Sequence, residues 1–105
     1  MEAGLRELIE SILGQAREKG WGAKPEEVNF GEKIALIHSE LSEALNAYRQ
    51  GNVHGKDGVN EEMADVLIRI LHFCGIYGID IEKEVRKKLE RNEGRDWDWD
   101  RLGKG

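Results

Sequence analysis

Two pairs of acidic residues with matching spacing lie in the middle of the chain. Glu40 and Glu43 are three positions apart, and after an 18-residue gap Glu62 and Asp65 repeat the separation. Residues three apart on a helix project from nearly the same side, so an antiparallel pair of helices would bring the two pairs together. Four carboxylates within about 5 Å would repel by roughly 3 kcal/mol per pair at an effective dielectric constant of about 20.

Divalent cations would remove this repulsion, and a ligand set made only of oxygens suits Mg²⁺ or Mn²⁺ better than zinc. A carboxylate cage with open positions is typical of metal-assisted phosphoryl chemistry. A reading from a different class stays open, because charged residues make up 35% of the chain and such pairs also occur on solvated faces. In that reading the chain is a non-catalytic helical dimerisation module. The position of Glu40 favours a metal site over a solvated face, because this residue lies at the edge of an apolar stripe, beside Ile37, Leu41 and Ala44.

Four segments that could position these acids have helical periodicity, and each is followed by a glycine: 2–19, 29–50, 60–77 and 80–93. Glycine is the preferred residue just past a helix end. Asn29 with Glu32 resembles a capping box, Asn60 precedes two glutamates, and Asp80 opens the last segment. No segment shows the period-two alternation of a half-buried strand, so the sequence predicts an all-α fold.

The third segment is apolar around most of its circumference. Its polar stripe is narrow and consists of Glu62, Asp65, Arg69 and His72. A helix of this kind is typical of the middle of a bundle, where its polar stripe faces either water or an internal site.

The length of 105 residues fits one domain, 1–105, with a tail from about residue 96. Four short helices make only a thin core, so we expect a second copy of the chain to complete it. The net charge of −5 argues against a nucleic-acid polymer as partner. No apolar run reaches the roughly 20 residues that span a bilayer, and the first residues lack signal-peptide features, so we expect a cytoplasmic protein without a membrane partner. A single cysteine, Cys74, excludes an intramolecular disulfide and is expected to be buried.

The ordered set of motifs resembles the MazG-type all-α nucleotide pyrophosphohydrolases. The acids read Glu40-Leu-Ser-Glu43, then Glu62-Met-Ala-Asp65, and they lie in the stretches IALIHSELSEALNAYRQGN and EEMADVLIRILHFCGIYGIDIE, which KKLERNEGR follows. The likeness covers about residues 21–95. It implies a four-helix MazG-like bundle completed by oligomerisation, as a homodimer or a dimer of dimers.

The resemblance also implies roles for particular residues. Glu40, Glu43, Glu62 and Asp65 would bind Mg²⁺, or Mn²⁺ in its place. Lys88, Asn92 and Arg95 match the family's Lys-x-x-x-Asn-x-x-Arg element and would contact the polyphosphate. Apart from the resemblance, basic residues at the end of a helix also have a purely structural explanation, because they interact favourably with the helix dipole.

The implied reaction is attack of a metal-activated water on the α-phosphorus of a nucleoside triphosphate, which yields a nucleoside monophosphate and pyrophosphate. The implied substrates are deoxynucleoside or non-standard nucleoside triphosphates, and the implied role is house-cleaning of the nucleotide pool. Glu43 is the candidate that accepts the proton from the water. Some relatives have a further acid directly before the first glutamate, and in this chain Ser39 occupies that position.

Two residues outside the acid pairs are candidates for contacts with the base. Trp21 could stack on a nucleobase or be a core or rim residue, and His38 could bind substrate or point into the bundle. The tail carries Trp97 and Trp99, which could cover the substrate or a neighbouring subunit. An activity like that of phosphoribosyl-ATP pyrophosphohydrolase is the alternative within the same superfamily.

Overall fold

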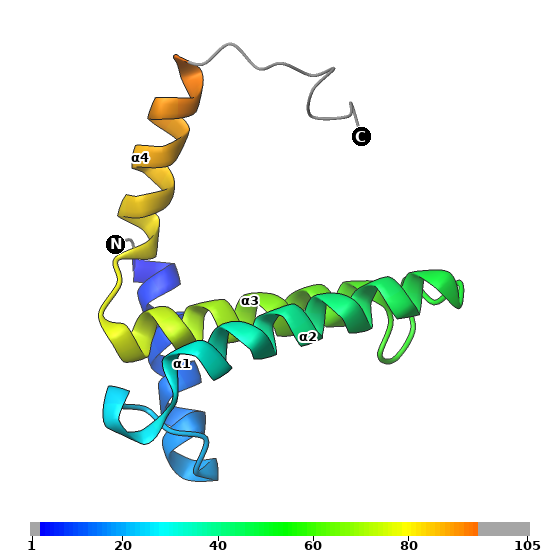
Figure 1. The fold of residues 1–105 in the computed structure, drawn as a ribbon, viewed down its shortest axis with the longest axis horizontal. Coiled ribbons are helices and arrows are strands. Elements are labelled where there is room, and N and C mark those ends of the chain that lie inside the picture. The colour runs from blue at the N-terminus through cyan, green and yellow to red at the C-terminus, as the bar shows by residue number, and fades with distance from the viewer. Residues whose placement is uncertain (1–2, 95–105) are drawn as a thin grey trace.

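The computed structural model describes residues 3–94, which fold into helices joined by short loops (Figure 1). In chain order the elements are α1 (Ala3–Lys19), the 3₁₀ helix η1 (Pro25–Glu27), α2 (Phe30–Arg49), α3 (Val59–Tyr77) and α4 (Ile81–Glu93). No strand occurs in this part of the chain, so the all-α prediction is confirmed. Each α-helix begins and ends within one residue of its predicted range, whereas η1 is an element that periodicity does not predict.

Side-chain caps fix the starts of two helices. The Asn29 carboxamide oxygen accepts a hydrogen bond from the backbone N–H of Glu32 at 2.8 Å, and the Asp80 carboxylate accepts one from Lys83 at 3.1 Å. Each bond satisfies a donor that the first turn would leave unpaired. α3 departs from the prediction, because its N-cap residue is Gly58 and Asn60 lies inside the helix.

α2 and α3 pack side by side as an antiparallel hairpin (Figure 1). At its open end the Phe30 ring contacts those of Phe73 and Tyr77, with centroid distances of 5.0 and 5.1 Å. At the closed end the Asn52 side chain accepts from the backbone N–H of Gly55 at 3.0 Å, which ties the loop together. The hairpin brings the two acid pairs onto adjacent helices, as their spacing predicts.

α1 packs against α3 and completes the small core. It approaches the α3 backbone at Gly75, where an added Cβ would lie 2.8 Å from the Ile9 Cγ2 atom and 3.0 Å from the Leu13 Cδ1 atom. A side chain at this position would force Ile9 and Leu13 to shift, so glycine favours the close approach of the two helices. The buried apolar side chains are Ile9, Ala16, Ala44, Ala47, Val66, Leu71, Cys74 and Ile76. The expected burial of Cys74 is confirmed, and burial raises the pKa of its thiol.

Much apolar surface is left uncovered. Met63 and Leu67 on α3 are 47% and 51% exposed, and Leu45 on α2 is 49% exposed. α4 contributes no buried side chain and projects away from the hairpin (Figure 1). The described residues of one chain therefore do not close a four-helix bundle. None of the described helices combines the length and apolarity needed to cross a membrane.

Candidate metal centre and adjacent cleft

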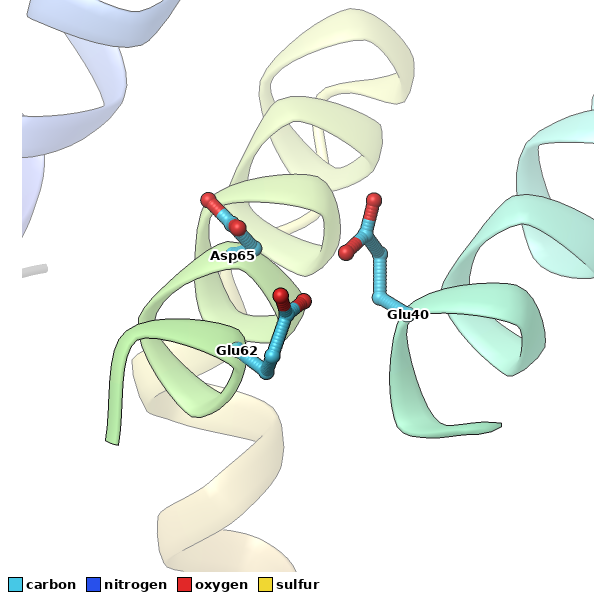
Figure 2. Close-up of side chains that lie close together, drawn as sticks. All are labelled: Glu40, Glu62 and Asp65. Carbon is cyan, nitrogen blue, oxygen red and sulfur yellow. The ribbon is translucent and has the colours of Figure 1, made fainter. Parts of the chain in front are cut away.

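Three of the four predicted acids meet between α2 and α3. Glu40 reaches from α2 toward Glu62 and Asp65 on α3, as Figure 2 shows, and one carboxylate oxygen of each lies within 4.8 Å of the others. Glu62 and Asp65 share a face because they are almost one helical turn apart, and the hairpin places Glu40 opposite them. The donor set consists only of carboxylate oxygens.

The burial of Glu62 separates this cluster from acids on a solvated helix face. Glu62 is only 7% exposed, and its Oε2 atom has no hydrogen-bond partner. A buried polar atom without a partner is costly in free energy, and two neighbouring carboxylates increase that cost for Glu62. A divalent cation would satisfy this atom, so the residues present fit an oxygen-ligated metal ion.

The same surroundings make Glu62 hard to ionise. Burial, first of all, and then a hydrogen bond shared with Glu40 raise the pKa of Glu62 to about 7. The negative charges of Glu43, Glu40 and Asp65 act in the same direction on this pKa. In the absence of a cation, Glu62 is therefore largely protonated below neutral pH.

Arg69 is the counter-ion of this acidic cluster. Its Nε–H donates to the Glu40 Oε1 atom at 2.8 Å, and the two side chains are 36% and 13% exposed, respectively. Arg69 lies four residues after Asp65, one turn further along α3, so it is on the same face as the acids. The guanidinium thus neutralises one of the three carboxylates.

A cleft of about 520 Å³ opens beside the acids, within the usual size range of small-molecule sites. Its wall combines Glu40 and Asp65 of the acidic cluster with cationic, aromatic and aliphatic side chains. The other lining residues are Ile12, Trp21, Glu32, Lys33, Leu36, Ile68, Arg69 and His72. Trp21 is 49% exposed at this wall, so its ring is accessible to a ligand.

His72 holds the loop that carries Trp21 against α3. Its Nε2 atom lies 2.7 Å from the Gly22 carbonyl oxygen, and its Nδ1 atom lies 3.4 Å from the Lys33 Nζ atom. A carbonyl only accepts and an ammonium only donates, so the imidazole is neutral with its proton on Nε2. Burial, together with the charges of Lys33 and Arg69, lowers the pKa of His72 and favours this neutral form.

Gly22 is required for this connection. Its φ of +94° is unfavourable for other residues, and a Cβ at this position would lie 2.5 Å from the Val28 Cγ1 atom. The loop can therefore present the Gly22 carbonyl to His72 only with glycine at this position.

The remaining predicted residues of α2 lie outside the three-carboxylate cluster. Glu43 is exposed, and its charge is close enough to Glu62 to raise the pKa of that carboxyl. His38 is exposed and does not line the cleft, because two positions along a helix separate it from Glu40 by about 160° around the axis.

The polyphosphate residues implied by the family resemblance lie on or beyond α4. Lys88 is exposed and Asn92 is partly buried, and their helix projects away from the acids of the same chain (Figure 1). Arg95 lies outside the described residues, as do Trp97 and Trp99.

Two cations of the cleft were not predicted as site residues: Lys33 lies outside the motifs, and Arg69 was expected only in the polar stripe of the third segment. Both have the spacing that could have identified them, since Lys33 is seven residues before Glu40 and Arg69 is seven after Glu62. A separation of seven is about two helical turns, which returns a side chain to the same face.

Comparisons with known proteins give one partial likeness and no family. No protein-family profile matches the chain, and no solved structure matches it. The chain is similar to a threonine–tRNA ligase of Solidesulfovibrio magneticus, with 30% identity over 80 residues. The matched segment is 73% of this chain but only 12% of the ligase, so the chain spans about an eighth of that protein's length.

The raised pKa of Glu62 predicts an unusual dependence of stability on pH. Between about 4.5 and about 7 the unfolded chain releases this proton while the folded chain keeps it, so the contribution of Glu62 to stability falls as pH rises. His72 has the opposite effect below its ordinary pKa, because its pKa is lowered on folding.

The Glu62→Gln variant isolates the contribution of Glu62. In EDTA, we expect the melting temperature of wild type minus that of Glu62→Gln to decrease as the pH is raised from 5 to 8. Thermal melts followed by circular dichroism measure this difference. Excess Mg²⁺ should raise the melting temperature of wild type far more at pH 8 than at pH 5, because at pH 5 the cation must displace the proton of Glu62. A difference between the two proteins that is independent of pH would show that Glu62 titrates normally.

Proposed function

We propose that this chain is a divalent-cation-dependent nucleoside triphosphate pyrophosphohydrolase. The observation that carries the proposal is the buried Glu62 carboxylate, whose Oε2 atom lacks a partner although it lies beside Glu40 and Asp65. This cluster borders a cleft with an accessible indole ring. The family resemblance of the motifs supplies the reaction class.

Glu40, Glu62 and Asp65 would hold Mg²⁺ or Mn²⁺. When bound, such a cation polarises phosphoryl oxygens and lowers the pKa of a coordinated water. The chain's own contribution is to fix the three carboxylates on two packed helices. Glu43, exposed beside the cluster, is the candidate that accepts the proton of the attacking water.

The cleft suits a ligand that has a ring at one end and phosphates at the other. Trp21 offers an indole face for stacking on a nucleobase, and Leu36 and Ile68 add apolar surface. Glu40 and Asp65 line the same cleft and would face the phosphates through the bound cation. The proposed substrates are deoxynucleoside or non-standard nucleoside triphosphates, with pyrophosphate and the monophosphate as products.

A second copy of the chain would complete the bundle. The sequence of α4 puts Ile81, Val85 and Leu89 on one face, and Val85 and Leu89 are 49% and 60% exposed. Packing this face on the uncovered apolar surface of a partner's hairpin would also bring Lys88 and Asn92 close to the partner's acids. A chain that sediments as a monomer at assay concentrations would refute this part of the proposal and leave the metal site standing.

The test is pyrophosphate release from a panel of ribo- and deoxyribonucleoside triphosphates, with Mg²⁺ and with EDTA. We expect equal amounts of pyrophosphate and nucleoside monophosphate with Mg²⁺, and neither product with EDTA. Release of orthophosphate and diphosphate would place cleavage at the wrong bond and overturn the mechanism. Absence of turnover, together with absence of metal-dependent stabilisation, would favour a non-catalytic helical module.

A further inference from the structure

Lys33 presents its ammonium group to the cleft without an anionic partner at hydrogen-bond distance among the described residues. Its one hydrogen bond in this part of the chain runs from Nζ to the Nδ1 atom of His72, which is neutral. The exposed Glu32 is its neighbour in sequence and also lines the cleft. Partial burial and the charge of Arg69 lower the pKa of Lys33, so the ammonium lies in surroundings that oppose its charge.

Arg69 lines the same cleft, and within its guanidinium only the Nε–H forms a hydrogen bond to the described residues. Its Nε–H donates to Glu40, and the structure gives the two terminal nitrogens no described carboxylate partner. The side chain is 36% exposed, so it has room to rotate. A guanidinium with a free edge is well suited to bidentate binding of a phosphate group.

The two cations repel each other, and an anion between them would relieve this repulsion. The acids on the wall oppose the anion, because Glu32, Glu40 and Asp65 outnumber Lys33 and Arg69. An anion would therefore bind only when the acidic cluster is neutralised by a divalent cation. Its ligand oxygens would then lie next to both the cluster and the two cations.

We propose that Lys33 and Arg69 form a phosphate-binding subsite beside the acidic cluster, and that Arg69 leaves Glu40 for the phosphate when a divalent cation binds. The inference rests on the proposed function and assigns contacts within one chain that the motif resemblance does not include. In the cation-free protein, Arg69 forms an ion pair with Glu40. With a divalent cation bound, the same guanidinium would bind the phosphate group of the ligand.

Because Arg69 is proposed to exchange Glu40 for phosphate, its replacement should change the affinities for metal and for phosphate in opposite directions. Replacing Arg69 removes a competitor for Glu40, so Arg69→Gln should bind Mn²⁺ alone about two- to fivefold more tightly than wild type. The same substitution removes a charged contact to phosphate, so binding of a diphosphonate at saturating Mg²⁺ should weaken by about tenfold. Lys33→Gln should weaken diphosphonate binding similarly without weakening Mn²⁺ binding.

Titration calorimetry with Mn²⁺, and separately with methylenediphosphonate in Mg²⁺, measures both quantities without turnover. Lys87→Gln is the matched control, because Lys87 lies on α4 and is paired only loosely with Glu84 at 3.8 Å. It should leave both affinities unchanged. Arg69→Lys keeps the charge and serves as the second variant if Arg69→Gln fails to fold. It should lose part of the diphosphonate affinity, because an ammonium cannot bind in bidentate fashion.

The outcomes separate the subsite from the function on which it rests. A wild-type chain that binds no Mn²⁺ would refute the proposed metal centre, and the subsite with it. Wild-type binding of Mn²⁺, with diphosphonate affinity absent or unaffected by both substitutions, would overturn the subsite alone. Weaker Mn²⁺ binding in Arg69→Gln would show that Arg69 orders Glu40 for the metal instead of competing with it, and would overturn the exchange.

Discussion

Substitution of Glu62 by glutamine should abolish cation-dependent turnover and yet raise the melting temperature of the cation-free protein above about pH 7, where the carboxyl group is ionised. The carboxylate is buried, lacks a partner for its Oε2 atom and lies close to two other acids, so the amide removes repulsion and adds a donor. The amide carries no charge to offset a bound cation. Because loss of a mere supporting contact around a metal costs about 10–100-fold, loss of this ligand should cost more than about a hundredfold in kcat/KM.

Glu61→Gln is the matched control for this prediction. Glu61 precedes Glu62 on α3, but it is exposed and its Oε1 atom accepts a hydrogen bond from the Asp57 backbone N–H at 3.0 Å, which a glutamine oxygen can also do. The control should keep both activity and melting temperature. Full activity in Glu62→Gln, measured as pyrophosphate release with Mg²⁺, would remove the observation on which the proposed function depends.

Substitution of Glu43 by glutamine should lower kcat by about 10²–10⁴-fold, the usual contribution of a general base. The family resemblance implies both metal binding and proton transfer for this residue, and we propose the second role because of where Glu43 lies. Glu43 is exposed and lies outside the three-carboxylate cluster, although its charge reaches Glu62. Its affinity for Mn²⁺, measured by titration calorimetry, should therefore change by no more than about fivefold.

The comparison of kcat with metal affinity supplies the second readout for Glu43. If this carboxylate takes the proton, Glu43→Gln should lower kcat without a matching loss of Mn²⁺ affinity. A fall in Mn²⁺ affinity that parallels the fall in kcat would instead make Glu43 a ligand and would contradict the assignment. Glu61→Gln again serves as the control, since both residues are exposed acids near the same helix pair.

Local chemistry made the helices predictable. Asn29 and Asp80 cap α2 and α4 through bonds to residues three positions later, and such short-range contacts depend only on the nearby sequence. The spacing of Glu40, Glu62 and Asp65 predicted their convergence for the same reason, because helical periodicity and one antiparallel pairing are sufficient.

Contacts between distant segments were not predictable in this way. The bond from His72 to the Gly22 carbonyl joins residues 50 positions apart, and the Arg69–Glu40 pair joins residues 29 apart. No periodicity within one helix contains that information. The separation of Glu43 from the cluster has a related origin, because residues three apart differ by about 60° around a helix, and the rotation of α2 against α3 decides which of them faces the acids.

The loop that carries Trp21 has a consequence for how this architecture can diversify. The acids belong to a continuous helical hairpin, whereas the indole ring comes from a short connecting segment that an imidazole–carbonyl bond joins to α3. Substitutions at Trp21 can therefore reshape the wall while leaving the carboxylates in register. If the proposed function holds, the residues that select the ligand and the residues that bind the metal belong to separate segments, so we expect the loop sequence to vary among relatives more than the acids do.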